Sequence, residues 1–299
     1  MTRLVSIGEA MVERGPGGDG PDAAIRFSGD TFNTAWYLAR AQPDWQIDYL
    51  TQVGEDATSD AFLDFALASG IGTGHIARHP SREMGQYVIE VTDGERSFEY
   101  ARETSAARML ASDEARLLDG LRGADIVYFS GITLAILPED HRELLFDVMG
   151  EVQAEGAIVA FDPNIREALW SDTDEMRGAI MEAALSSDII LPSFAEEARL
   201  FGDAEPKATM ARYLSAGAQS VVVKNGAGPI HYSVSDTAGT HQPGTVAQII
   251  DTTAAGDSFN AGFLGHLISG HSPAEAVAAA SQLAEEVIQH HGALLNDAG

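Results

Sequence analysis

Residues 251–257, with the sequence DTTAAGD, combine small side chains and a carboxylate in a pattern that suits chemistry at a phosphate. Apolar residues recur at every fourth position after them, which predicts a helix that begins near Asp257. Small side chains at a helix N-terminus leave the first backbone N–H groups open, and with the helix dipole these donors form an anion site. A carboxylate there repels phosphate, so Asp257 suits a base that takes a proton from an attacking hydroxyl. An anion site beside a base describes phosphoryl transfer.

The same turn also has a purely structural interpretation. Asp257 is then an ordinary first-turn acid that the helix dipole favours, and Ala254, Ala255 and Gly256 serve tight packing. A glycine-rich turn alone is weak evidence, so the spacing leaves both interpretations open. The dipeptide Gly-Lys never occurs, which excludes a P-loop and leaves this turn as the phosphate site if the chain has one.

Composition and charge limit the classes of protein that the chain can belong to. It has 299 residues and no cysteine, a length that suits a single domain, 1–299, with one substantial core. Its net charge of −27 repels nucleic acid and anionic lipid, so we expect neither as a partner. No apolar run approaches the roughly 18 residues that span a bilayer. The apolar stretch 4–7 is too short for a signal peptide, and with no disulfide to form we expect a cytoplasmic protein.

The second half of the chain alternates short apolar runs with amphipathic stretches. The expected strands are residues 126–129, 158–161, 189–191 and 220–223, and the expected helices lie near 113–122, 138–155, 174–186, 206–216 and 273–289. Strands that are apolar on both faces and joined by helices indicate a mostly parallel sheet covered on both sides, a three-layer α/β/α fold. Ligands of such sheets bind beyond the carboxyl ends of the strands.

The first half of the chain adds a β-hairpin that does not fit this alternation. Residues 86–91 and 96–102 alternate apolar and polar side chains on either side of Asp93-Gly94, which is a strong hairpin signal. Such a hairpin packs apart from a parallel sheet. Together with short strands within residues 11–28, it predicts a small antiparallel lid.

Three side chains of this hairpin are candidates to face a ligand. Arg102 suits a carboxylate because it carries a fixed charge and a fork of donors, and Tyr87 and Tyr100 offer hydroxyls on rigid rings. From the residues alone, lid packing by the tyrosines and a solvated Arg102 is the favoured interpretation. Just past the expected strand 158–161, Arg166 is a similar candidate, with an ion pair to Glu167 as its alternative.

The stretch DTTAAGDSFNAGF resembles the C-terminal signature of the ribokinase-like (phosphofructokinase-B type) carbohydrate kinase family. The resemblance implies a ribokinase-like three-layer fold with a small β lid, and ATP-dependent phosphorylation of a sugar. It also implies that the amides of residues 254–256 form the anion hole and that Asp257 is the catalytic base. Further motifs resemble the same family in the same order, so the resemblance covers nearly the whole chain.

One of these motifs, SGDTFNTAWYLAR, is similar to the family's sugar-binding signature and most similar to that of its 2-keto-3-deoxygluconate kinases. The resemblance implies that Gly29, Asp30 and Asn33 line the sugar site, whereas the pattern alone indicates a capped core helix. Ser28 stands where the family usually has a second glycine.

The hairpin and the end of the strand 158–161 resemble the same kinases through the stretches QYVIE, YAR and FDPNIREALW. The resemblance implies that an acid sugar is held by Tyr87, Tyr100, Arg102 and Arg166. It also implies that Arg166 touches the transferred phosphate.

Two more motifs concern ATP and magnesium. LPSFAEEARLFG looks like the family's Asn-x-x-Glu element, in which Glu196 orders magnesium-bound water and Ser193 replaces the asparagine; a first-turn helix acid explains Glu196 equally well. VVVKNGAGP looks like the nucleotide loop. The residues that the family pattern assigns to ATP are Asn164, Ser193, Lys224, Gly226, Gly228, Ala255 and Gly256. A monovalent cation near Asp251 is a further candidate cofactor.

Taken together, the motifs predict ATP-dependent phosphorylation of 2-keto-3-deoxygluconate to its 6-phosphate. One alternative is a kinase for a neutral sugar, such as fructose or tagatose, or for a nucleoside. Another is a non-catalytic sugar-binding sensor, although such a protein has no need of the base Asp257. The edge strands of the lid could pair between two chains, which motivates a homo-oligomer hypothesis.

Overall fold

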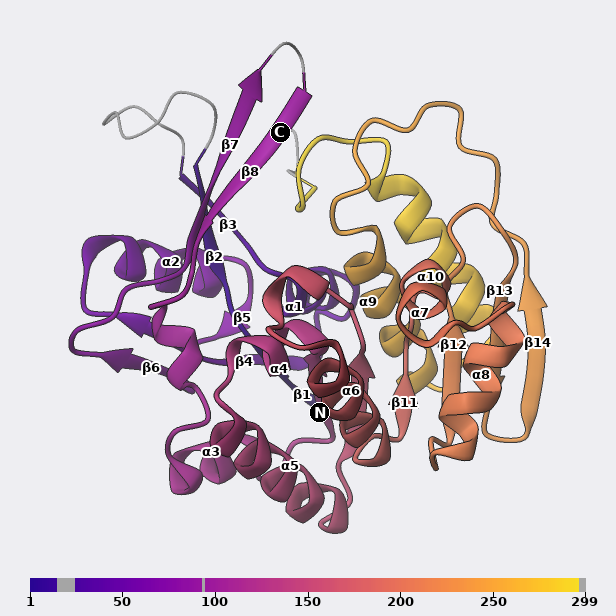
Figure 1. The fold of residues 1–299 in the computed structure, drawn as a ribbon, viewed down its shortest axis with the longest axis horizontal. Coiled ribbons are helices and arrows are strands. Elements are labelled where there is room, and N and C mark those ends of the chain that lie inside the picture. Colours follow the sequence, from indigo (N-terminus) through magenta and orange to yellow (C-terminus); the bar gives the residue numbers. More distant parts are fainter. Residues whose placement is uncertain (15–24, 93–94, 296–299) are drawn as a thin grey trace.

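A computed structural model describes residues 1–14, 25–92 and 95–295 and shows a ten-stranded sheet beside a four-stranded one (Figure 1). In spatial order the large sheet contains β14 (Thr237–His241), β13 (Ile230–Val234), β12 (Ser220–Val223), β11 (Ile189–Ile190), β10 (Ile158–Asp162), β9 (Ile126–Ser130), β1 (Arg3–Ile7), β4 (Gln46–Gly54) and β5 (Ile71–Gly72), with β6 (Ile76–His79) also paired to β4. Among the described strands of this sheet, β13 pairs antiparallel with both of its neighbours, β12 and β14, and the other pairs are parallel, so the expected mostly parallel sheet is confirmed.

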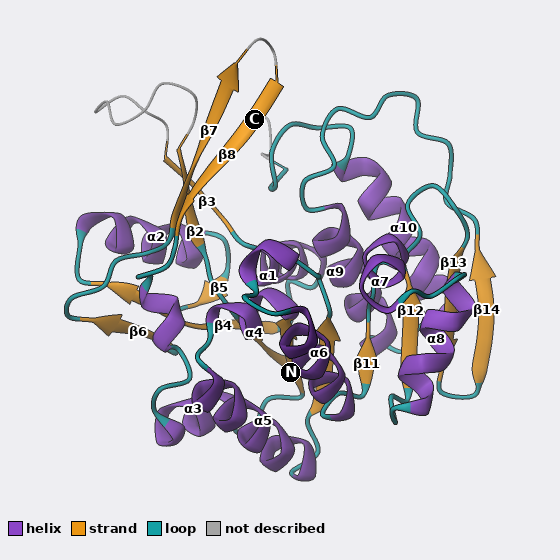
Figure 2. Cartoon of the chain, viewed as in Figure 1, coloured by secondary structure: helices purple, strands orange, loops and turns teal. Residues whose placement is uncertain are grey.

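Helices surround the central strands (Figure 2). They are α1 (Asp30–Ala41), α2 (Ala57–Ala68), α3 (Glu114–Leu121), α4 (Gly131–Ile136), α5 (Glu139–Ala154), α6 (Thr173–Leu185), α7 (Phe194–Phe201), α8 (Pro206–Ser215), α9 (Ala255–Ile268) and α10 (Pro273–Val287). Each long helix expected in the second half of the chain is present. Within the described ranges, no helix has both the length and the apolar character that crossing a membrane requires.

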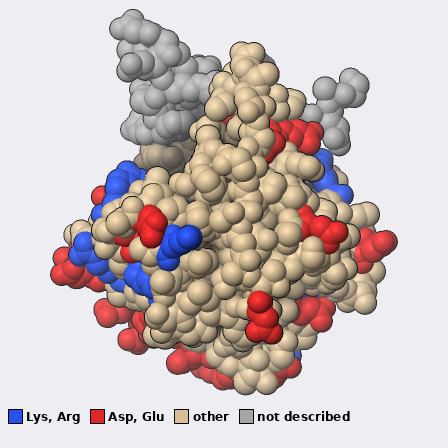
Figure 3. Space-filling view, turned by 90° about the vertical axis from the view of Figure 1, so that its right-hand side faces the viewer, with Lys and Arg blue, Asp and Glu red and all other residues tan. Residues whose placement is uncertain are grey.

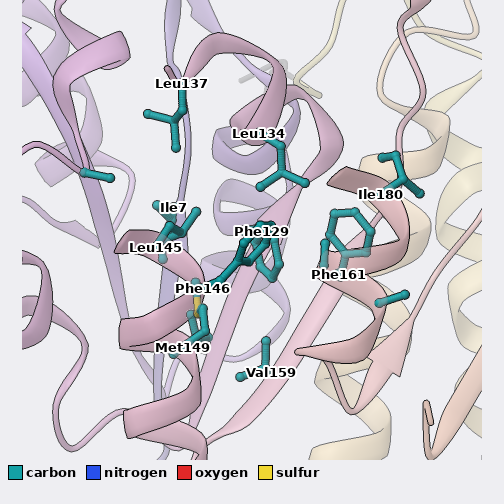
Figure 4. Packing of buried hydrophobic residues seen from close by; sticks show 14 of the residues in the cluster. Ile7, Phe129, Leu134, Leu137, Leu145, Phe146, Met149, Val159, Phe161 and Ile180 are labelled. Atoms are coloured by element: carbon teal, nitrogen blue, oxygen red, sulfur yellow. The ribbon is translucent and has the colours of Figure 1, made fainter. Parts of the chain in front are cut away.

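The large sheet is buried on both of its faces. In β9, Val127 and Phe129 pack into one apolar cluster with side chains of α3, α5 and α6. The alternate residues Ile126 and Tyr128 point to the other face, into the clusters formed with α1, α9 and α10. Figure 4 shows the first cluster, in which the rings of Phe129 and Phe161 lie with their centroids 4.8 Å apart. Burial on both faces explains why these strands read as continuous apolar runs.

The small sheet rises from the large one and forms the expected lid. Its order is β3 (Ile25–Ser28), β2 (Met11–Arg14), β7 (Gln86–Thr92) and β8 (Glu95–Ala101). The prediction of an antiparallel lid is wrong in one respect, because β2 and β7 pair parallel. Each of these two strands leaves the large sheet after a parallel strand, β1 and β6, so both enter the lid in the same direction. The predicted turn at Asp93-Gly94 lies outside the described residues.

One expected strand end is absent from the described chain. In the sequence, the β-branched pair at residues 249–250 is typical of a strand end, but both residues lie in the connection that follows β14. The backbone N–H of Ile250 donates to the carbonyl of Ile288 at the end of α10, at 2.8 Å, and Ile249 is 62% exposed. Ile250 therefore bonds to a helix end, and Ile249 lines a cavity. The β-branched pattern predicts neither role.

Candidate active site

The N-terminus of α9 lies where two cavities meet. A cavity of about 680 Å³ lies beneath the lid, and one of about 550 Å³ lies beside α10 and the loop after β12. Both are lined by Ser193, Lys224, Thr252, Ala255 and Gly256. Ligands in the two cavities would therefore meet at the first turn of α9, whose N–H groups have no partner inside the helix. This arrangement is what transfer of a group between two bound molecules requires.

The turn itself is sharply bent. Ala254 has φ 61° and ψ 12°, the left-handed conformation that costs a non-glycine residue about 1–2 kcal/mol. Such a cost persists only where the surroundings hold the backbone, and it is common at functional sites. A methyl group on Gly256 would lie 3.5 Å from Lys224 Nζ, so the ammonium group stands directly beside the turn that is predicted to bind an anion.

Asp257 is the carboxylate at the floor of the lid-side cavity. Asn33 Nδ2 donates to its Oδ2 at 2.8 Å, and Thr34 Oγ1 donates to its backbone carbonyl at 3.2 Å. Although the side chain faces the cavity, the dense protein around it removes water, and this burial together with the charge of Asp30 raises the pKa of Asp257 to about 8. Asp162 adds to the rise and Lys224 opposes it. A carboxyl group that titrates near neutral pH suits a general base.

A buried network of polar side chains lies next to Asp257. Lys224 Nζ donates to Asp162 Oδ2 at 2.8 Å and to Asn260 Oδ1 at 3.1 Å. Asn260 Nδ2 donates to the same Asp162 oxygen at 2.6 Å and to the hydroxyl of Tyr128 at 3.0 Å. Asp162 is 3% exposed, so its charge depends on the lysine for compensation. The network fixes the lysine between the two cavities.

The predicted sugar-binding stretch lines the lid-side cavity at the start of α1. Asp30 Oδ2 accepts from Asn164 Nδ2 at 2.7 Å, and Asn164 has φ 32°. Asn164 therefore lies with the sugar-side residues, whereas the family pattern assigned it to ATP. Gly29 is required because a Cβ there would lie 2.2 Å from the carbonyl oxygen of Glu9. Ser28 is tolerated, since its hydroxyl lies 2.8 Å from that of Tyr87.

The lid contributes its three predicted side chains to the same cavity. Tyr87, Tyr100 and Arg102 all line it. Tyr87 donates to Glu13 Oε2 at 2.5 Å, and burial followed by the charge of Glu13 raises the pKa of Tyr87 well above its usual value. The side chain of Arg102 is only 11% exposed and forms an ion pair with Glu9. A solvated Arg102, the interpretation that the residues alone favoured, is therefore wrong.

Arg166 reaches the cavity from the segment after β10. Its Nη1 lies 2.5 Å from Glu196 Oε1, and Glu196 Oε2 accepts from the backbone N–H of Ile165 at 3.1 Å. The ion pair of Arg166 is therefore with Glu196 and not with Glu167, the alternative partner considered from the sequence. Glu196 therefore holds the segment that carries Arg166, a role the motif alone does not indicate.

The second cavity contains most of the residues predicted to bind ATP. Gly226 lines it in a left-handed conformation with φ 55°. Gly228 does not line it but closes the loop, because its N–H donates to the carbonyl of Asn225 at 2.8 Å. The wall includes the apolar residues Ile230 and Ile288, which suit a flat aromatic base.

Known proteins decide which family this site belongs to. Residues 1–297 match the pfkB family of carbohydrate kinases. The chain belongs to this family. It is 33% identical to the 2-dehydro-3-deoxygluconokinase of Haemophilus influenzae, over 99% of the chain and 96% of that protein. It is 35% identical to the Escherichia coli K12 enzyme of the same name, over 98% of the chain and 97% of that protein.

Solved structures agree with the pfkB fold. The crystal structure of a PfkB protein from Polaromonas sp. JS666 has a TM-score of 0.83 at 27% identity, and the match covers 97% of this chain and 96% of that one. A fructokinase from Xylella fastidiosa with bound ATP has a TM-score of 0.80 at 24% identity, covering 97% and 93%. The chain is therefore a carbohydrate kinase with the ribokinase-like fold.

PfkB kinases use ATP and Mg²⁺. Within the described ranges, no group of three or more His, Asp or Glu side chains is placed to hold a metal ion. Mg²⁺ in kinases keeps several waters and is bound by one or two carboxylates together with the substrate phosphates. The carboxylates of Asp162 and Glu196, both lining the lid-side cavity, supply oxygen donors of this kind. The donor set therefore fits a magnesium ion that arrives with ATP.

Anionic ligands approach this kinase against a repulsive surface. Asp and Glu side chains are spread over the face in Figure 3, whereas Lys and Arg gather at few places on it. With a net charge of −27, attraction has to come from short-range contacts inside the cleft. Arg102, Arg166 and Lys224 are the cations that line the two cavities.

Several site residues were not found from the sequence. Glu9 pairs with Arg102, and Glu13, in the lid strand β2, accepts from Tyr87. Asp162 and Asn260 form the buried network with Lys224. Glu9 and Asp162 each stand at or just after the carboxyl end of a parallel strand, so the strand-end rule could have found them. Asn260 lies one helical turn after Asp257, and only the fold reveals that it faces Lys224.

Asp257→Asn should abolish turnover and stabilise the fold at the same time. Loss of a general base typically costs about 10²–10⁴ in rate. A raised pKa in the folded state means that ionised Asp257 destabilises it. This penalty is absent below the unfolded pKa of 3.8, grows as pH rises, and is complete above about pH 8. Thermal unfolding should therefore show a higher Tm for Asp257→Asn at pH 8.5 and nearly equal values at pH 4. Asp119→Asn, an exposed acid on α3, is the control, and a lower Tm for Asp257→Asn at pH 8.5 would contradict the assignment.

Asp162→Asn should shift the pH dependence of the kinase toward lower pH. For the parent protein, kcat/KM should rise about tenfold per pH unit and level off near the pKa of Asp257, about 8. The charge of Asp162 raises the pKa of Asp257, and the charge of Lys224 lowers it. Removal of the Asp162 charge takes away the first effect and leaves Lys224 uncompensated, so both changes lower the pKa of Asp257. The midpoint of the acid limb is the quantity to measure. If the midpoint of Asp162→Asn equals that of the parent, or shifts only as much as that of the control Asp119→Asn, the network does not set the pKa of Asp257.

Proposed function

We propose that this kinase transfers the terminal phosphoryl group of ATP to the 6-hydroxyl of 2-keto-3-deoxygluconate. The observation that carries the proposal is the pair of arginines, Arg102 and Arg166, that line the lid-side cavity together with Tyr87 and Tyr100. A neutral sugar offers no group that needs two guanidinium groups, whereas a sugar acid offers a carboxylate that suits their forked donors. The two relatives at 33% and 35% identity are both named 2-dehydro-3-deoxygluconokinase, a name for this activity.

In this proposal the sugar lies with its carboxylate toward the lid and its terminal hydroxyl toward Asp257. Asp257 in its ionised form accepts the hydroxyl proton as the oxygen forms a bond to the terminal phosphorus of ATP. The bond from phosphorus to the bridging oxygen breaks, and ADP leaves with that electron pair. The N–H groups of the α9 N-terminus and Lys224 stabilise the charge on the transferred group. When bound with ATP, magnesium would neutralise part of the charge on the phosphates.

A second candidate is a kinase for a neutral sugar. It is favoured by the pairing of each arginine with an acid, Arg102 with Glu9 and Arg166 with Glu196, which leaves less net charge for a substrate carboxylate. A fructokinase of Vibrio alginolyticus is 27% identical over 72% of the chain. A non-catalytic sensor is disfavoured, because Asp257 lines the lid-side cavity at the first turn of α9 with a pKa suited to a base.

Arg102→Ala should separate the two substrate classes. A charge-assisted contact to a buried carboxylate contributes about 1.5–3 kcal/mol, so KM for 2-keto-3-deoxygluconate should rise about 10- to 100-fold. ATP consumption by the parent and the variant is measured with 2-keto-3-deoxygluconate, fructose and ribose, and Arg116→Ala, on the far helix α3, is the control. Turnover of fructose or ribose in place of the acid sugar, unaffected by Arg102→Ala, would establish the neutral-sugar kinase instead.

A further inference from the structure

Glu9 is a buried acid in the sugar cavity to which the mechanism above gives no role. It follows β1 by two positions, at the carboxyl edge of the large sheet, and its side chain is fully buried while it lines the lid-side cavity. Its backbone carbonyl packs against Gly29. On the other side, a Cβ at Gly85 would lie 2.6 Å from Glu9 Oε1. Glycine at position 85 therefore keeps space open around this oxygen.

The two carboxylate oxygens of Glu9 have different surroundings. Oε2 accepts from Arg102 Nη2 in the ion pair that joins the large sheet to the lid. Oε1 has no hydrogen-bond partner among the described residues, and neither has Arg102 Nε. A simple counterion would take the two-pronged contact that arginine offers a carboxylate, with both oxygens engaged. A buried carboxylate oxygen without a donor is costly, which indicates that a bound molecule supplies the donor.

We propose that Glu9 binds the sugar substrate directly and sets its specificity. Oε2 holds Arg102 with its remaining donors toward the substrate carboxylate, and Oε1 accepts a hydrogen bond from a hydroxyl of the same molecule. The site therefore recognises a polyhydroxylated acid, because Arg102 binds its carboxylate and Glu9 binds one of its hydroxyl groups. This inference rests on the proposed function for the carboxylate, whereas the hydroxyl contact applies to any sugar that the cavity accepts.

Glu9→Gln tests the contact because it keeps the shape and removes the charge. We expect KM for the sugar to rise five- to twentyfold and kcat to change less than threefold. KM for ATP should stay within twofold, since Glu9 lines the lid-side cavity and not the second one. Glu182→Gln, an exposed acid on α6, is the control. Gly85→Ala tests the same contact without altering any charge. A methyl group against Oε1 should raise KM in the same way, so the test does not depend on the folding of one variant.

A substrate analogue separates direct contact from mere support of Arg102. 2-Oxohexanoate keeps the carboxylate, the ketone and the six-carbon chain but has no hydroxyl group. In Glu9→Gln its affinity, measured by calorimetry with a competitive-inhibition check, should stay unchanged or improve while the sugar's KM rises. An equal loss for both ligands would overturn the hydroxyl contact, and an unchanged sugar KM in both Glu9→Gln and Gly85→Ala would overturn the whole proposal.

The substrate preference of the parent protein distinguishes a failure of the Glu9 proposal from a failure of the proposed function. If the parent phosphorylates fructose and not 2-keto-3-deoxygluconate, the acid-sugar function fails. Glu9 is then measured with fructose, whose hydroxyls still need an acceptor, and the same rise in KM is expected. No rise with fructose would overturn Glu9 as a sugar-binding residue as well.

Discussion

The crowding of carboxylates around the first turn of α9 is the constraint on which the rest of this site depends. Asp30, Asp162 and Asp257 come from three different elements. Burial, and then the negative charges of Asp30 and Asp162, raise the pKa of Asp257. A single lysine, Lys224, offsets part of this charge. The arrangement destabilises the fold locally, and the large two-faced sheet compensates by holding each element in place. The result is a carboxylate whose pKa, raised to about 8, suits the proposed role of general base.

Each cation of the cleft is held by an acid of the protein before any substrate arrives. Arg102 pairs with Glu9, Arg166 with Glu196, and Lys224 with Asp162. Pairing orients these side chains and limits the charge that the empty cleft presents, which matters in a chain with so large a net negative charge. Because Arg102 belongs to the lid and Glu9 follows β1, the first of these pairs also links the lid to the large sheet.

The sequence was informative where one pattern has one structural consequence. The alternation of apolar runs predicted the parallel sheet, and the hairpin pattern predicted β7 and β8. The small residues before Asp257 predicted the helix N-terminus at α9, where the two cavities meet, whereas the anion site itself stays a prediction. The parallel pairing of β2 with β7 could not be predicted, since strand periodicity carries no information about the direction of a partner. The pairings of Arg102 with Glu9 and of Lys224 with Asn260 join positions far apart in the chain, and only the fold brings them together.

The most direct test of the central claim is the titration of the Asp257 carboxyl carbon by ¹³C NMR in the protein without ligands. The resonance is assigned by its absence in Asp257→Asn. The burial of Asp257 among the other carboxylates predicts a midpoint near pH 8. A midpoint near 4, the ordinary value for aspartate, would contradict it, because Asp257 would then be an unperturbed surface-like acid.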